Sequence, residues 1–267
     1  MGWSCVNLFF HRRRSHAPGQ YVIFSLKSLS LNGQAEGATS EFLNFIAKSP
    51  VAEMINHFTD SMEAQGAGAI VNNLCVRPGQ SVAVFGAGGI GLCAIAAAAA
   101  VDAHPIIAVD VAEEKLAFAQ RFGATNVINA KKSEPVAAIR ELTDGGVDYA
   151  IDAIGLPQTQ EQILRTARMG YPGLSRGGTA LLIGITPPGA QAILDTSLFI
   201  GSRSFTRTSG GDSRPDRDFP LFVRWFREGK LKLDELVTRR YALEQINEAV
   251  DDLEHGRILG RAIITYA

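Results

Sequence analysis

The chain has 267 residues, of which 46% are hydrophobic and 20% charged, a balance typical of a soluble globular protein with a buried core. The formal net charge of −1 gives no electrostatic reason to expect a nucleic acid or an acidic membrane as partner. Cys5, Cys75 and Cys93 lack the spacing of a metal site and indicate a reducing compartment. We therefore expect a cytoplasmic protein without a membrane span.

The N-terminal stretch differs in composition from the rest of the chain. It holds three consecutive arginines, Arg12, Arg13 and Arg14, and no acidic residue before Glu36. Transit peptides share this pattern with basic, poorly ordered tails, and we favour the tail. Apolar spacing predicts a short strand in residues 21–26 and helix from about residue 40. Residues 1–63 are therefore interpreted as a divergent and partly disordered segment.

A glycine-rich turn follows the first clear strand, which is expected at residues 81–85. Gly86, Gly88 and Gly91 form a G-x-G-x-x-G pattern before a run of small residues suited to a tightly packed helix. The first glycine permits a tight turn, the second lets backbone N–H groups approach phosphates, and the third lets the helix lie against the strand. Because a helix N-terminus also attracts anions, we expect a dinucleotide pyrophosphate at this turn.

A second strand, expected at residues 106–109, ends in Asp110. This carboxylate comes about 20 residues after the turn, where it can accept hydrogen bonds from both adenosine ribose hydroxyls. The same charge would repel a 2′-phosphate, so the pattern favours NAD over NADP. The competing interpretation is that Asp110 only caps the next helix.

Strands and helices alternate regularly beyond Asp110. Strands are expected at residues 126–128, 148–154 and 179–185, and helices at residues 113–122, 135–142 and 158–169. This alternation indicates a doubly wound, parallel α/β sheet, a Rossmann fold, which we assign to residues 64–220. The pattern then loosens, with a strand within 198–208, a mixed-charge loop at 210–218, helices at 219–228 and 243–255, and a terminal strand at 262–266. Residues 221–267 are interpreted as C-terminal helices and a terminal strand.

Several short motifs occur in an order and at a spacing known from one enzyme family. They are Ala67-Gly68-Ala69, Val76-x-Pro78-Gly79, Gly86-Ala87-Gly88-Gly89-Ile90-Gly91, Val109-Asp110, Phe122-Gly123-Ala124-Thr125, Asp148-Tyr149-Ala150-Ile151-Asp152 and Gly177-Gly178. Together they resemble the C-terminal, NAD-binding half of medium-chain, zinc-type alcohol dehydrogenases over about residues 64–267. The resemblance implies NAD as cofactor, hydride transfer between NAD and an alcohol or aldehyde, and a homodimer formed through the strand near residues 202–208.

The resemblance also implies further contacts to the cofactor. Residues 183–185 would lie beside the nicotinamide, with a backbone carbonyl holding its amide, and Ser209 or a neighbour within residues 208–210 would offer backbone groups from the other side. Lys115 would reach the adenosine ribose or else lies on a solvated helix face, and Arg261 would contact the pyrophosphate or carries an interface charge. The expected cofactor-binding residues are Gly86, Gly88, Gly89, Ile90, Gly91, Asp110, Lys115, Ile183, Gly184, Ile185, Ser209 and Arg261.

The chain departs from the family where catalysis would take place. The family's N-terminal catalytic domain holds the catalytic zinc ligands, including a Gly-His-Glu stretch, whereas residues 1–63 contain neither that stretch nor a cysteine cluster. The third zinc ligand aligns with Ser61 or Asp60, and a neutral serine is a poor ligand for zinc. Zinc is expected for the family, but we assign no metal site and no catalytic residue to this chain.

Three functions remain open from the sequence. The first is a truncated or divergent NAD-dependent alcohol dehydrogenase acting on a small alcohol or aldehyde, in which an unrecognised group or another subunit replaces the zinc. The second is an NAD-binding module without turnover, acting as a sensor, partner subunit or remnant. The third is a zinc-free reductase of the same superfamily, but most of these prefer NADPH, which Asp110 disfavours.

The terminal strand raises a structural question. In the family this strand joins the sheet of the catalytic domain, so residues 262–266 would lack their usual partner. An exposed apolar strand edge promotes aggregation unless it is covered. We expect residues 21–26 or residues 40–62 to cover it.

Overall fold

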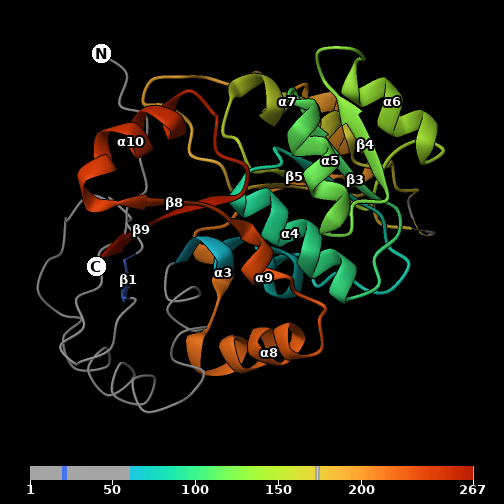
Figure 1. Ribbon diagram of the computed structural model, residues 1–267. Helices are drawn as coiled ribbons and strands as arrows, with labels where there is room; N and C mark the ends of the chain where they lie inside the picture. Colours follow the sequence, from blue (N-terminus) through green and yellow to red (C-terminus); the bar gives the residue numbers. More distant parts are fainter. Residues whose placement is uncertain (1–19, 23–60, 172, 174, 267) are drawn as a thin grey trace, which may run out of the picture. The chain divides into compact units, whose positions relative to one another are not determined.

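The computed structural model describes residues 20–22, 61–171, 173 and 175–266 (Figure 1). These residues form two compact units, which are described separately. One comprises residues 61–232, and the other is built on residues 233–266 together with the strand at residues 20–22. The predicted helix beginning near residue 40 lies outside the described residues.

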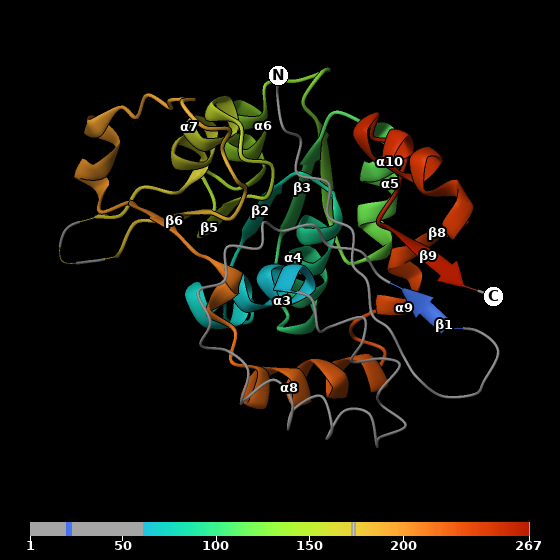
Figure 2. The ribbon, with the colours of Figure 1, turned by 90° about the vertical axis from the view of Figure 1, so that its left-hand side faces the viewer.

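The larger unit is built on a six-stranded, wholly parallel sheet with the order β4-β3-β2-β5-β6-β7 (Figures 1 and 2). Its strands are β2 (Val82–Phe85), β3 (Ile106–Asp110), β4 (Asn126–Asn129), β5 (Tyr149–Asp152), β6 (Thr179–Leu182) and β7 (Ser204–Arg207). Strands β3 and β4 extend the sheet on one side of β2, and β5, β6 and β7 extend it on the other side, which is the doubly wound order. The predicted Rossmann fold is therefore confirmed.

Helices connect the strands, as a parallel sheet requires. The unit contains α3 (Ser61–Gly68), α4 (Gly89–Ala100), α5 (Glu113–Arg121), α6 (Pro135–Leu142), α7 (Pro157–Thr166) and α8 (Pro215–Arg227), with short turns η1 (Ala69–Asn73), η2 (Thr196–Gly201) and η3 (Gly210–Asp212). Local sequence explains the helix starts. Before α6, for example, the Glu134 carboxylate accepts the N–H groups of Val136 and Ala137, and Pro135 occupies the first helical position.

The core lies on the sheet, where every residue of β2 and β3 is buried. Strands buried on both faces have continuous apolar sequences, which is why β2 and β3 could be recognised from the sequence. One core cluster consists of Ala83, Phe85, Ile107, Val109, Ile128, Ile139, Val147, Ala150, Ile163, Leu164 and Ala180. Helix α4 adds a mostly buried run of alanines, whose small side chains allow close packing.

The C-terminal part of this unit differs from the predicted boundaries. Helix α8 begins at Pro215, so the end of the expected loop at residues 210–218 is its first turn. Pro215 stands at the first helical position, and Asp216 and Asp218 complement the positive end of the helix. The domain boundary expected after residue 220 lies within this helix. The expected strand in residues 198–208 is shorter, because η2 occupies its first part.

The smaller unit contains a three-stranded sheet with the order β1-β9-β8. Its elements are β1 (Gln20–Val22), α9 (Leu233–Leu236), β8 (Val237–Ala242), η4 (Leu243–Gln245), α10 (Ile246–Glu254) and β9 (Arg261–Tyr266). Strand β1 pairs antiparallel with β9, so the expected cover of the terminal strand by residues 21–26 is confirmed at Tyr21 and Val22. Strand β8, which was not predicted, pairs with the other side of β9.

A buried aspartate connects the ends of β5 and β6 through its side chain and its backbone carbonyl. Asp152 is completely buried, and its carboxylate accepts the N–H groups of Ile154 at 2.9 Å and Gly155 at 3.1 Å and the Thr159 hydroxyl at 3.0 Å. Its backbone carbonyl accepts the N–H groups of residues 183 and 184, both at 2.9 Å. Burial raises the pKa of the Asp152 carboxyl, although these hydrogen bonds oppose the rise.

We expect Asp152→Asn to change how stability depends on pH. The folded-state pKa lies above the ordinary value of 3.8, so this carboxyl stabilises the fold most below that pH and less as the pH rises through the folded-state pKa. Asparagine does not titrate. Between about pH 4 and pH 7 the native protein should therefore lose unfolding free energy relative to D152N.

Urea unfolding at several pH values measures this difference. Asp144→Asn, which removes an exposed carboxylate from a turn, is the matched control. Its unfolding free energy should depend on pH as that of the native protein does. A difference between native protein and D152N that stays constant with pH would contradict the prediction.

Candidate functional site

The carboxyl ends of the parallel strands form the candidate site. In doubly wound sheets, ligands bind at this edge, where the strand order reverses, and here the reversal lies between β2 and β5. The predicted residues Gly86, Asp110, Ile183 and Ser209 follow or end β2, β3, β6 and β7. The fold therefore brings them to one edge of one sheet.

The glycine-rich turn places an uncapped helix N-terminus at this edge. Gly86 has a φ of 100°, and a Cβ on Gly91 would lie 1.8 Å from the Gly86 carbonyl oxygen, so the start of α4 packs directly on the turn. No side chain caps the helix at Gly88, and a Cβ there would meet nothing within 4 Å. Gly88 is exposed and Gly89 and Ile90 are half-buried, so the first N–H groups of α4 lie near the surface, where they suit a phosphate.

Asp110 is fixed by the same turn. One carboxylate oxygen accepts the Ala87 N–H at 2.8 Å, and the other accepts the N–H groups of Val111 at 2.7 Å and Ala112 at 3.1 Å. Its exposed fraction is 9%. The residue that precedes α5 as its N-cap is Ala112, so Asp110 supports the turn before the helix rather than capping it. A carboxylate offers about four acceptor positions, which leaves room for a further hydrogen bond on the oxygen that Ala87 uses.

The other predicted residues divide between the two units. Lys115 is half-buried in the first turn of α5, on the side of the sheet that holds Asp110. Ile183 is buried, Ile185 is 55% exposed, and Gly184 lies between them after β6. Arg261 begins β9 in the smaller unit.

Two residues that matter at this edge were not predicted as site residues. Asp152 belongs to one of the family motifs, and its carboxylate holds the loop after β5. A buried aspartate at a strand's carboxyl end, followed three residues later by glycine, is the signal that could have identified it. Thr208 was expected to offer backbone groups at most. Its N–H donates to the Leu182 carbonyl at 3.1 Å, which places it beside the residues that follow β6.

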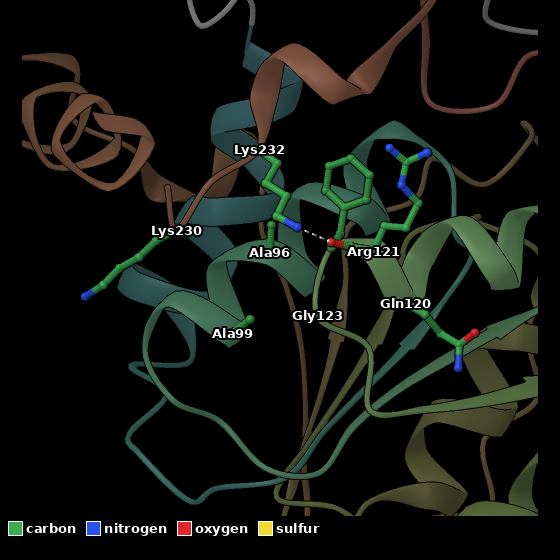
Figure 3. Close-up of a pocket in the computed structure, with 8 residues that line it drawn as sticks. Ala96, Ala99, Gln120, Arg121, Gly123, Lys230 and Lys232 are labelled. Carbon is green, nitrogen blue, oxygen red and sulfur yellow. Dashed lines mark hydrogen bonds between the residues drawn. The ribbon is translucent and has the colours of Figure 1, made fainter. Parts of the chain in front are cut away.

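A separate cavity of about 320 Å³ lies near the C-terminal ends of α4 and α5 (Figure 3). Its lining is Ala96, Ala99, Gln120, Arg121, Phe122, Gly123, Lys230 and Lys232. The Thr125 N–H bonds the carbonyl of Ile106, the first residue of β3, so the end of α5 lies at the opposite edge of the sheet from the glycine-rich turn.

The charged groups of this cavity stabilise helix ends. The Lys232 ammonium donates to the Arg121 carbonyl at 3.2 Å, at the negative end of α5, while the side chains of Lys230 and Arg121 point away from one another (Figure 3). An anion here would face the negative ends of two helices. We therefore do not include the cavity in the dinucleotide site.

The described residues do not fit a zinc site. In the parts of the chain that the structure describes, no group of three or more His, Cys, Asp and Glu residues lies close enough to hold a metal ion. Asp60, one of the two positions aligned with a zinc ligand, lies outside the described residues, and Ser61 begins α3. We accordingly derive no chemical step through zinc. Within the same described parts, no helix combines the length and apolar character needed to cross a membrane.

Comparisons with known proteins identify the family. The profile of the zinc-binding dehydrogenase family matches residues 89–228. The chain is 31% identical to S-(hydroxymethyl)glutathione dehydrogenase of Komagataella pastoris, over 75% of this chain and 52% of that protein. It is 34% identical to geraniol dehydrogenase of Castellaniella defragrans, over 74% of this chain and 52% of that protein.

Solved structures agree with these relatives. Benzyl alcohol dehydrogenase of Acinetobacter calcoaceticus superposes with a TM-score of 0.71 at 37% identity, covering 77% of this chain and 55% of that one. An alcohol dehydrogenase zinc-binding domain protein of Burkholderia ambifaria gives a TM-score of 0.70 at 38% identity, covering 76% and 53%. The chain spans about half the length of the curated relatives it matches. It belongs to the zinc-binding dehydrogenase family, within the superfamily of medium-chain, zinc-type alcohol dehydrogenases, as its motifs predicted.

Proposed function

We propose that this protein is an NAD(H)-binding oxidoreductase of the alcohol dehydrogenase type, which binds its cofactor along the carboxyl edge of the six-stranded sheet. The observation that carries the proposal is Asp110, whose carboxylate is held against the glycine-rich turn by the Ala87 N–H at 2.8 Å. This bond fixes the distance between a phosphate-binding turn and a ribose-binding carboxylate. The two groups thus suit the ribose and the pyrophosphate of an adenosine diphosphate.

The electrostatics of Asp110 support NAD rather than NADP. The carboxylate is mostly buried, so its charge is screened less than that of a surface residue. A 2′-phosphate placed beside it would meet strong repulsion, whereas ribose hydroxyls would donate hydrogen bonds to it.

The strand order indicates where the rest of the cofactor would lie. With the pyrophosphate at α4 and the adenosine ribose at β3, the remaining mononucleotide extends across the reversal of strand order toward β5, β6 and β7. Residues 183–185 and Ser209 follow β6 and β7 on that side. Bound NAD would supply a hydride acceptor at C4 of the nicotinamide, and this chain's residues would position the ring.

The relatives support an alcohol or aldehyde as the substrate class. Two of the matching proteins are named for geraniol and benzyl alcohol, both primary alcohols. We propose a primary alcohol and its aldehyde as the substrate pair of this protein. The free thiol of Cys75 supports a cytoplasmic location.

The first experiment measures binding and turnover together. Calorimetric titration of the purified full chain with NAD and with NADP should show tighter binding of NAD, and metal analysis with a screen of primary alcohols would establish zinc content and NADH formation. Failure to bind NAD at about millimolar concentration, the weak end of the affinity scale, would reject the proposal. NAD binding without zinc and without NADH formation would instead support an NAD-binding module that acts as a sensor or partner subunit.

Asp110→Asn should lower the preference for NAD. The amide keeps one of the two acceptor oxygens that the backbone uses, so affinity for both cofactors can fall. Because it also removes the charge that repels a 2′-phosphate, the ratio of NAD to NADP affinity should fall by about tenfold, equivalent to about 1.4 kcal/mol. Asp144→Asn removes an exposed charge outside the site and should leave the ratio unchanged. An unchanged ratio in D110N would contradict the role of this carboxylate.

We also propose that two copies associate through β7. In the described chain β7 is an outer strand of the sheet, and the preceding segment exposes Ile193 and Ile200 by 79% and 75%. An open strand edge beside exposed apolar side chains favours association, and a two-fold axis would pair the edge with itself.

Sedimentation velocity should show a dimer of the native chain, and Ile200→Glu should shift it to monomer by burying a charge in the interface. Leu142→Glu, which changes an exposed leucine at the end of α6, is the control and should remain dimeric. A native monomer at micromolar concentration, or an I200E protein that dimerises normally, would argue against the edge contact.

A further inference from the structure

The Thr208 hydroxyl is a buried polar group without a partner. Thr208 is 5% exposed, and its Oγ1 has no hydrogen-bond partner among the residues that the structure describes. Most buried polar groups in folded proteins are paired, because an unpaired one has lost its water without a replacement. An unpaired hydroxyl near a ligand site therefore indicates a place where a ligand supplies the partner.

Its position in the fold is defined by neighbouring strands. Thr208 directly follows β7, and its N–H donates to the carbonyl of Leu182, the last residue of β6, at 3.1 Å. Ile183 comes next along the chain after Leu182. The hydroxyl thus belongs to the carboxyl edge, beside the residues after β6.

The segment after Thr208 is anchored to the rest of the unit. The Ser213 hydroxyl donates to the Ala64 carbonyl of α3 at 2.9 Å. A Cβ on Gly211 would lie 2.6 Å from the Gln65 carbonyl oxygen, so the backbone of η3 contacts the backbone of the same helix. These contacts hold the segment in one place relative to the sheet, as a ligand-binding position requires.

Other polar side chains at this edge are already paired. The Asp152 carboxylate accepts the Thr159 hydroxyl at 3.0 Å, and the Gln160 side-chain amide donates to the Thr186 hydroxyl. Neither pair needs a ligand to complete it. Thr208 differs from both because its backbone N–H is bonded to β6 while its side-chain hydroxyl is left unpaired within the described chain.

We propose that the Thr208 hydroxyl forms a hydrogen bond with the carboxamide of the nicotinamide ring when NAD(H) binds. The inference rests on the proposed NAD site, whose second mononucleotide extends toward β5, β6 and β7. A carboxamide has an oxygen acceptor and two N–H donors, and a threonine hydroxyl can donate to the first or accept from the second. Because the hydroxyl lies below the surface, binding includes a local shift of side chains at this edge.

The consequence is specificity for the intact dinucleotide. ADP-ribose contains the adenosine, the pyrophosphate and a second ribose but no nicotinamide, so it should not use Thr208. A substitution at Thr208 should therefore lower the affinity for NAD and leave the affinity for ADP-ribose unchanged. A general loss of structure would weaken the binding of both ligands.

The test compares three variants of the full chain by calorimetric titration with NAD and with ADP-ribose. Thr208→Val removes the hydroxyl and keeps the side-chain shape, and Thr208→Ser keeps the hydroxyl. Thr206→Val is the control, because it removes an exposed hydroxyl from β7.

We expect T208V to weaken NAD binding by about tenfold, with the affinity for ADP-ribose within about twofold of the native value. T208S and T206V should bind both ligands as the native protein does. Thermal unfolding of T208V without ligand should occur at or above the native temperature, because the substitution removes an unpaired buried group.

Three results would overturn the inference. The first is a T208V protein that binds NAD with native affinity. The second is an equal loss of affinity for NAD and for ADP-ribose in T208V, and the third is a T208V protein that does not fold. A native chain that binds neither NAD nor ADP-ribose would reject the proposed NAD site as well. Native binding of both ligands with no selective effect in T208V would leave that site standing and remove only the role of Thr208.

Discussion

Helix α4 is held between two backbones with no space for a side chain, and this contact determines the geometry of the candidate site. A Cβ on Gly91 would lie 1.8 Å from the Gly86 carbonyl oxygen, and a Cβ on Gly66 would lie 2.3 Å from the Ile90 carbonyl oxygen. The turn before α4 and helix α3 therefore meet its first residues from different sides. Close-packed backbones resist displacement, so the first N–H groups of α4, which we propose bind a phosphate, are held in place by the fold itself.

Helix α3 extends this constraint to the other half of the site. The same helix that packs on α4 through Gly66 accepts the Ser213 hydroxyl and contacts the backbone at Gly211. The segment after β7 is therefore positioned by the helix that supports the glycine-rich turn. Asp152 performs a related role between β5 and β6, because one residue accepts the N–H groups of both following loops. Both proposed mononucleotide positions thus depend on contacts within the unit of residues 61–232.

Much of this fold was predictable because its signals are local. Buried parallel strands read as apolar runs, and the glycine pattern marks a turn whatever lies around it. Strand β8 gave no such signal, since Thr238, Arg239 and Arg240 are exposed and Tyr241 is its buried residue. The start of α8 was missed because a proline and two aspartates suit a loop as well as a first helical turn. Thr208 could not have been identified from the sequence, because whether a buried hydroxyl finds a partner depends on residues far from it in the chain.

The carboxylates at the candidate site are better suited to binding and support than to proton transfer. Asp152 is completely buried and accepts three donors, and two of them are N–H groups of the loop it holds. Asp110 accepts three backbone N–H groups, and a carboxylate can accept about one hydrogen bond more. A general base must reach the proton it removes, and both groups are committed to the backbone around them. In the proposed function the described unit therefore positions the cofactor, and oxidation of an alcohol would require a proton acceptor from the substrate side of the nicotinamide.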